Sequence, residues 1–136
     1  MEKIVRRSAG ILNIACDPHG AACDLPAGPS EVLVIADETA RPGFVAADLL
    51  AQAEHSADAQ VILVTTSRAL IHGVNEELQR QCTTRHRIAM ITGSLAHGRA
   101  VLVPDLAIAF EVSNRYAPEH LIIATGSPRQ WLACVT

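Results

Sequence analysis

Short, nearly continuous apolar runs recur along the chain, separated by longer mixed stretches. Each run is rich in Val, Ile, Leu and Ala and is bounded by polar or turn-forming residues. A run of this kind is typical of a β-strand that is buried on both faces of a parallel sheet. The pattern therefore predicts four strands, over residues 31–37, 59–67, 99–105 and 119–126.

Helix signals follow every predicted strand. Ser and Asp are preferred N-cap residues, and Pro is tolerated in the first turn, where its missing N–H is not needed. Apolar residues then recur at three- and four-residue intervals, as on the buried face of a helix. The predicted helices run from Thr39 or Pro42 to His55, over 68–82 with Ser67 as N-cap, over 106–116 with Asp105 as N-cap, and onward from Ser127 and Pro128.

Strands and helices alternate in this prediction, and each connection is long enough to hold a helix. Parallel strands need such crossover connections. The order therefore predicts an α/β fold, an open, mostly parallel sheet with helices on both faces. We expect one domain over residues 1–136, with a short helix over 1–16 and a loop over 16–31.

Composition narrows the class of protein. The 136 residues are 49% hydrophobic and 18% charged, which fits a soluble globular domain. A net charge of −3 gives no basis for nucleic-acid binding, and no apolar run is long enough to span a membrane. The four cysteines, without CxxC spacing, are expected to be reduced and mostly buried in a cytoplasmic protein. They are Cys16, Cys23, Cys82 and Cys134.

Ligands of open parallel sheets gather outside the carboxyl ends of the strands, so chemistry is expected there. The sequence has no glycine-rich phosphate loop of the GxGxxG or GxxxxGK[ST] type, and no GxSxG nucleophile elbow. Three other stretches carry candidate side chains. In "AGPSE" (27–31), Ser30 presents a hydroxyl at a tight turn before a strand, although turn chemistry alone also explains the stretch.

The other two stretches contain histidine. In "QAEH" (52–55), Gln52 and His55 share a helix face at i, i+3, which suits half a metal site but also a polar surface stripe. In "NRYAPEHL" (114–121), Pro118 ends a helix, and Glu119 and His120 begin a strand. A Glu–His pair can supply a general base and a water activator, but a polar strand start would look the same.

Taken together, the three stretches resemble the histidinol dehydrogenase family. Residues 24–65 and 112–123 carry its characteristic blocks in matching order and spacing, and the similarity covers residues 17–136, with 1–16 divergent. The resemblance implies an incomplete Rossmann-like domain and a zinc-dependent homodimer. It also implies oxidation of L-histidinol to L-histidine through an aldehyde, with reduction of two NAD.

The resemblance also implies roles for individual residues. Gln52 and His55 correspond to zinc ligands that help to bind the substrate, and Ser30 to a substrate contact. Glu119 corresponds to the residue that activates water for attack on the aldehyde. His120 corresponds to the general base that takes the hydroxyl proton. Zinc then mainly orients histidinol through its amine and imidazole.

The family's remaining zinc ligands, an Asp and a His, and most of its NAD contacts lie in segments that this sequence does not match. We therefore expect a truncated, single-domain piece of the enzyme that is inactive by itself and forms an oligomer, with a dimer favoured. The alternative is a non-catalytic binding or assembly module that retains the fold and relic motifs. Neither hypothesis involves nucleic acid or a membrane.

Overall fold

A single parallel sheet forms the centre of the computed structural model, which describes residues 30–136. The helix expected over 1–16, and the loop expected over 16–31 except for its last two residues, lie outside the described part. The sheet has the strand order β3-β2-β1-β4, and every neighbouring pair is parallel. Its strands are β1 (Glu31–Ala36), β2 (Gln60–Thr65), β3 (Arg99–Leu102) and β4 (His120–Ala124).

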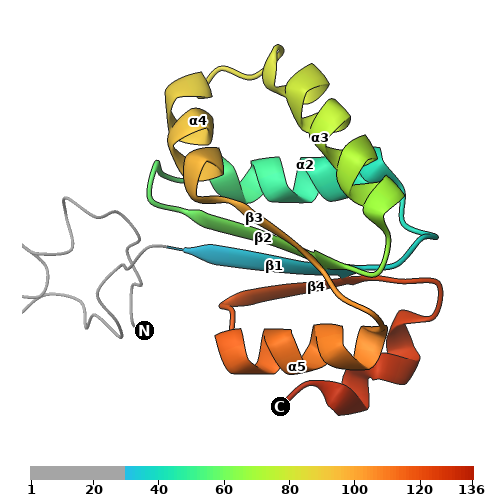
Figure 1. The fold of residues 1–136 in the computed structure, drawn as a ribbon. Helices are drawn as coiled ribbons and strands as arrows, with labels where there is room; N and C mark the ends of the chain where they lie inside the picture. The colour runs from blue at the N-terminus through green and yellow to red at the C-terminus, as the bar shows by residue number, and fades with distance from the viewer. Residues whose placement is uncertain (1–29) are drawn as a thin grey trace, which may run out of the picture.

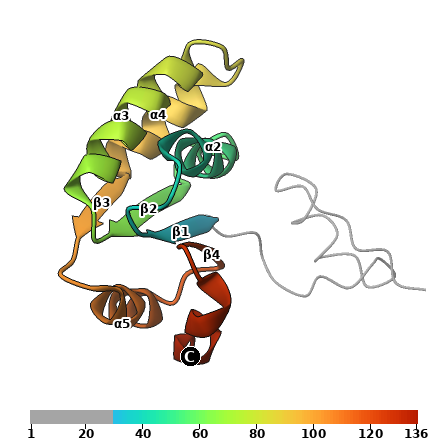
Figure 2. The same ribbon diagram turned by 90° about the vertical axis from the view of Figure 1, so that its right-hand side faces the viewer.

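Helices cover both faces of this sheet. Figures 1 and 2 show α2, α3 and α4 on one face, and α5 with the C-terminal 3-10 helix η1 on the other. This arrangement confirms the predicted α/β class with an open parallel sheet. The helices are α2 (Pro42–Ala53), α3 (Arg68–Cys82), α4 (Ile88–His97), α5 (Leu106–Tyr116) and η1 (Pro128–Cys134).

The core has two halves because successive strand residues point to opposite faces of the sheet. On β1, Val32 and Val34 pack under α2, whereas Leu33 and Ile35 pack against α5. All four are buried, since β1 lies between β2 and β4 and has helices on both sides. Phe110 of α5 and Trp131 of η1 stack at 5.3 Å between ring centroids and close the second half.

The local signals at helix starts worked as expected. Ser67 accepts a hydrogen bond from the Leu70 N–H, and Asp105 accepts one from the Ile108 N–H, as N-caps do. Pro42 is the first residue of α2. The four predicted strands are all present, although each is shorter than its apolar run.

Three details of the predicted helices were wrong. Helix α4 was not predicted, so two helices connect β2 to β3. Its sequence is apolar around most of its circumference, and Arg87 at its N-cap makes no side-chain capping bond, so neither period nor cap marked it. The last helix is 3-10 in type. Helix α2 ends at Ala53, which leaves His55 in the following turn.

The expectation of buried thiols holds only in part. Cys82 is partly buried and Cys134 is exposed, and both are free. Cys16 and Cys23 lie outside the described residues. Within the described range, no helix is long and apolar enough to cross a membrane.

A close approach between α4 and the loop before β2 generates the first prediction. A Cβ on Gly93 would lie 2.7 Å from the Cβ of Ala57 and 3.2 Å from its Cα, so the backbone would have to move. Overpacking of this kind costs about 1–3 kcal/mol, and the helix propensity of Ala returns only about 1 kcal/mol. We expect Gly93→Ala to lower the free energy of unfolding, as measured by urea denaturation.

Gly43→Ala, in the first turn of α2, is the matched control. Its added Cβ would meet the movable Glu77 carboxylate at 3.4 Å, which is ordinary contact. Stability should therefore stay the same or rise by up to about 1 kcal/mol. Equal effects of the two substitutions would contradict the tight contact between α4 and Ala57.

Candidate functional site

The predicted site residues lie at the amino edge of the sheet, on the left in Figure 1. Ser30 directly precedes β1, and Glu119 directly precedes β4. Helix α2 runs back from the carboxyl edge, so its end, with Gln52 and His55, lies at the amino edge too. The expectation that chemistry gathers at the carboxyl ends of the strands was wrong for these residues.

Ser30 and Glu119 are joined directly, although 89 positions separate them in the chain. The Ser30 hydroxyl donates a hydrogen bond of 2.8 Å to Oε2 of Glu119. The pairing of β1 with β4 explains this contact, because Val32 lies opposite His120, so Glu119 lies beside the start of β1, next to Ser30. Ser30 is thus more than a turn residue, since it contacts the carboxylate of a second motif.

Glu119 and His120 form a pair at the start of β4. Nε2 of His120 lies 3.7 Å from Oε1 of Glu119, so these neighbouring side chains both reach the same space. Their side chains are 58% and 56% exposed, respectively. A carboxylate and an imidazole side by side can together transfer protons to and from a bound molecule.

Gln52 and His55 differ in their surroundings. His55 lies in the turn after α2, where its N–H donates to the carbonyl of Gln52 at 3.0 Å, and it is exposed. Gln52 is only 7% exposed, which contradicts a purely surface stripe. Within the described residues its buried Nε2 has no hydrogen-bond partner. An unpaired buried amide costs about 1–3 kcal/mol, so this side chain suits a partner from outside residues 30–136.

These two residues fit part of a zinc site only. An imidazole and an amide oxygen are acceptable donors, and the turn keeps the two residues adjacent. A catalytic zinc site needs about three protein ligands and an open position. The part of the chain that the structure describes holds no cluster of three or more His, Cys, Asp or Glu residues able to bind a metal.

At the opposite, carboxyl edge, Asp37 closes the space between β1 and β4. Its carboxylate accepts hydrogen bonds from the N–H and hydroxyl of Thr39, at 3.0 and 2.5 Å, and from the N–H of Gly126 at 3.0 Å. Partial burial opposes ionisation, but these hydrogen bonds outweigh it and hold the pKa of Asp37 below its ordinary value.

This closure bears on dinucleotide binding. The strand order reverses at β1 and β4, which is where doubly wound sheets bind a pyrophosphate. Here the donors that such a group would need are taken by the Asp37 carboxylate, whose negative charge repels phosphate. At the switch point formed by the described strands, these N–H groups are therefore engaged within the chain.

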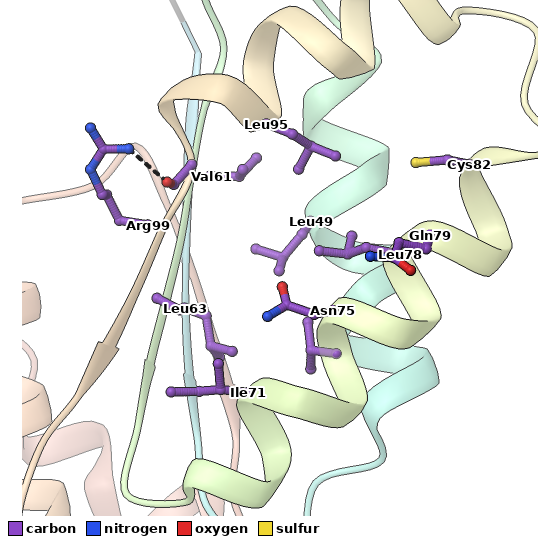
Figure 3. A pocket seen from close by; sticks show the side chains of 13 residues that line it. Leu49, Val61, Leu63, Ile71, Asn75, Leu78, Gln79, Cys82, Leu95 and Arg99 are labelled. Atoms are coloured by element: carbon purple, nitrogen blue, oxygen red, sulfur yellow. Dashed lines mark hydrogen bonds between the residues drawn. The ribbon is translucent and has the colours of Figure 1, made fainter.

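A cavity of about 480 Å³ lies elsewhere, between α2, α3, α4 and strands β2 and β3 (Figure 3). Its walls are mainly apolar, with Leu49, Leu63 and Leu78 among them, and Asn75 also lines it. None of the five predicted site residues lines this cavity. Its size would suit a ligand, but its mainly apolar lining offers few groups for acid–base chemistry.

Two features beside the site were not predicted. The hydroxyl of Tyr116 donates to Oε1 of Gln60 at 2.7 Å, which links the end of α5 to the start of β2. Ala117 has φ 54°, in the left-handed region that residues with a Cβ rarely adopt. Pro118 correctly marked the end of the helix, but a residue before Pro is usually extended, so no sequence signal indicated this conformation.

Comparisons with known proteins agree with these motifs. The family model for histidinol dehydrogenase matches residues 16–136. Histidinol dehydrogenase from Xanthomonas campestris pv. campestris (strain 8004) is 57% identical over 115 residues, which cover 85% of this chain and 27% of that protein. The enzyme of the same name from Xylella fastidiosa (strain Temecula1) is 54% identical over 111 residues, covering 82% of this chain and 26% of that protein.

A solved structure is similar as well. The crystal structure of histidinol dehydrogenase from Elizabethkingia anophelis superimposes with a TM-score of 0.81 at 45% sequence identity. The match covers 86% of this chain and 27% of that one. The chain thus spans about a quarter of the length of these relatives.

The Asp37 contacts generate the second prediction. A carboxylate with a lowered pKa in the folded state stabilises the fold above its unfolded pKa, and this contribution is lost as the pH falls through the folded value. Asp37→Asn should therefore lower the free energy of unfolding at pH 7 by about 1 kcal/mol, the size of a typical net hydrogen bond. The difference from wild type should shrink on acidification below about pH 4.

Denaturant unfolding at a series of pH values measures both effects. Glu38→Gln removes the exposed neighbouring carboxylate and is the matched control, with little change expected at any pH. A loss for Asp37→Asn that stays constant down to pH 2 would show that the charge of Asp37 is not what stabilises this edge.

Proposed function

The chain belongs to the histidinol dehydrogenase family, and from this premise we propose that it carries the acid–base part of a site that oxidises L-histidinol to L-histidine. The Ser30–Glu119 hydrogen bond of 2.8 Å is the observation that carries the proposal. It unites two motifs far apart in sequence around one carboxylate. His120, 3.7 Å from the same carboxylate, completes the group.

Each residue has a distinct part in the proposed chemistry. Nε2 of His120 accepts the proton of the substrate's hydroxyl group as the alcohol is oxidised. The Glu119 carboxylate takes a proton from the water that adds to the aldehyde in the second step. Ser30 keeps Glu119 in place before the substrate arrives and then shares its hydroxyl with the substrate.

Gln52 and His55 are proposed to contribute two ligands to a zinc ion that also draws ligands from outside residues 30–136. Bound zinc would orient the substrate through its amine and imidazole groups. Oε1 of Gln52 is the atom that would ligate zinc, while its buried, unpaired Nε2 is a donor that suits a hydrogen-bond acceptor from outside residues 30–136. His55 is exposed and adjacent, so its imidazole is accessible to the same ion.

We propose that this chain does not turn over histidinol by itself. Glu119 and His120 are more than half exposed, so water would screen the charges that the reaction must control. Hydride transfer needs a positioned nicotinamide, and at the described switch point the Gly126 N–H is already bonded to Asp37. NAD is therefore proposed to bind mainly to segments outside the described part.

A homo-oligomer, with a dimer favoured, is part of the same proposal, in the cytoplasm where free thiols stay reduced. Several large apolar side chains are exposed and would be covered by association. They are Phe44, Ile88, Met90, Leu102, Leu132 and Val135. Light scattering should find a particle larger than one chain, and a monomer at every concentration would contradict this.

A non-catalytic binding or assembly module remains the alternative. In that case the motif residues are relics that no longer bind the substrate. The two hypotheses differ in a direct measurement, because a relic has no affinity for histidinol.

The next prediction separates these hypotheses. In isothermal titration calorimetry, the chain should bind L-histidinol weakly in the presence of zinc and more weakly without it. Mixed with histidinol, NAD and zinc, it should form no NADH above the rate without protein. Rapid NADH formation would contradict the proposed incompetence, and the absence of binding at any concentration would favour the relic.

Two histidine variants sharpen the titration. His55→Ala should abolish the effect of zinc on histidinol binding, because it removes one of the two proposed ligands. His72→Ala is the matched control, since His72 is an exposed histidine near the start of α3, at the opposite edge of the sheet. Equal losses in both variants would show that the zinc effect does not involve the Gln52–His55 pair.

A further inference from the structure

Glu119 belongs to a closed loop of contacts, called the circuit below, that links Ser30, Gln60 and Tyr116. The Gln60 N–H donates to the Ser30 carbonyl at 3.1 Å, and the Tyr116 hydroxyl donates to Oε1 of Gln60 at 2.7 Å. Covalent bonds lead from Tyr116 through two residues to Glu119, which accepts the Ser30 hydroxyl at 2.8 Å. The circuit closes at Ser30. Glu119 is therefore restrained through its side chain by Ser30 and through its backbone by the segment that begins at Tyr116.

The segment inside this circuit is short and conformationally restricted. Ala117 is held in the left-handed region, with φ 54° and ψ 60°, and its N–H donates to the Ser113 carbonyl at 2.8 Å. Pro118 follows, and its ring fixes its own φ. A residue with a Cβ stays in the left-handed region only where the surroundings hold it there. Tyr116, directly before this turn, is the residue anchored on the sheet.

The surroundings of Tyr116 suit an anchor. Its ring packs on the core cluster under α5, and its hydroxyl reaches the first residues of both β1 and β2. Burial, and hydrogen bonding and charge from Glu31, raise the pKa of Tyr116, so the hydroxyl stays protonated and can donate. Glu31 and Gln60 lie opposite each other in the β1–β2 register, which makes this a rigid attachment point.

We propose that Tyr116 is a positioning residue for the Glu119 carboxylate. Its hydroxyl, anchored at the amino ends of β1 and β2, holds the Ala117–Pro118 turn so that Glu119 stays beside Ser30 and His120. The importance of this positioning for catalysis rests on the proposed function. The mechanical part, that the hydroxyl controls the conformation of Glu119, holds whether or not the chain binds histidinol.

Tyr116→Phe tests the mechanical part, because it removes the hydroxyl and retains the ring in the core. By NMR, the wild-type Glu119 side chain should occupy one χ1 rotamer, and the variant should average over several. Exchange of the Ala117 amide hydrogen should become about tenfold faster, as expected for the loss of one hydrogen bond. The amides of Ile35 and Ile123, in the sheet centre, should not change.

Gln60→Leu combined with Glu31→Leu removes both acceptors of the Tyr116 hydroxyl and should reproduce both changes. Gln130→Leu, an equal substitution at an exposed glutamine of η1, is the matched control and should reproduce neither. An unchanged Glu119 rotamer and Ala117 exchange in Tyr116→Phe would overturn the proposal. A fall in overall stability alone, without these local changes, would overturn it too, since the hydroxyl would then be merely structural.

Histidinol titration tests the catalytic meaning separately. Tyr116→Phe should bind histidinol about tenfold more weakly with zinc present, and combining it with Glu119→Ala should cost no more than Glu119→Ala alone. Additive losses would overturn the route through Glu119. If wild type binds no histidinol, the proposed function fails, and the NMR result still decides whether Tyr116 positions Glu119.

Discussion

The parallel pairing of β1 with β4 is the constraint on which the candidate site depends. Val32 opposite His120 sets the register, and this register alone brings Ser30 beside Glu119 across 89 positions of sequence. The pairing is stable because β1 is buried on both faces, between the helices α2 and α5. A shift by one residue would turn the apolar side chains of β4 to the wrong faces and separate the two motifs.

The two ends of strands β1 and β4 differ in how far their polar groups are already paired. At the carboxyl edge, Asp37 uses its hydrogen-bonding capacity on Thr39 and Gly126, so the usual ligand position of a doubly wound sheet is closed. At the amino edge, Glu119 and His120 are open to solvent. The candidate site residues therefore lie at the opposite end of the strands from the one where this fold class usually binds ligands.

Much of this fold could be predicted from local sequence signals. Continuous apolar runs marked the four strands, and Ser67 and Asp105 marked helix starts, because both signals act over a few residues. Helix α4 was not predicted because it is apolar on most sides and has no side-chain N-cap. The candidate site residues were chosen by residue type and motif and stay predictions, whereas the hydrogen bond between Tyr116 and Gln60 depends on strand register, which no local pattern encodes.

Two features at the amino edge of the sheet have the same physical explanation. The amide of Gln52 is buried without a partner, although a buried polar group is normally paired. The carboxylate and imidazole of the Glu119–His120 pair are held in place, yet they are exposed to the water that weakens their electrostatic effect. Both features make physical sense if further polypeptide covers this edge, and the relatives are about four times as long as the matched stretch. In the proposed function, the sheet positions the acid–base groups, and the covering segments would supply the enclosure that makes them effective.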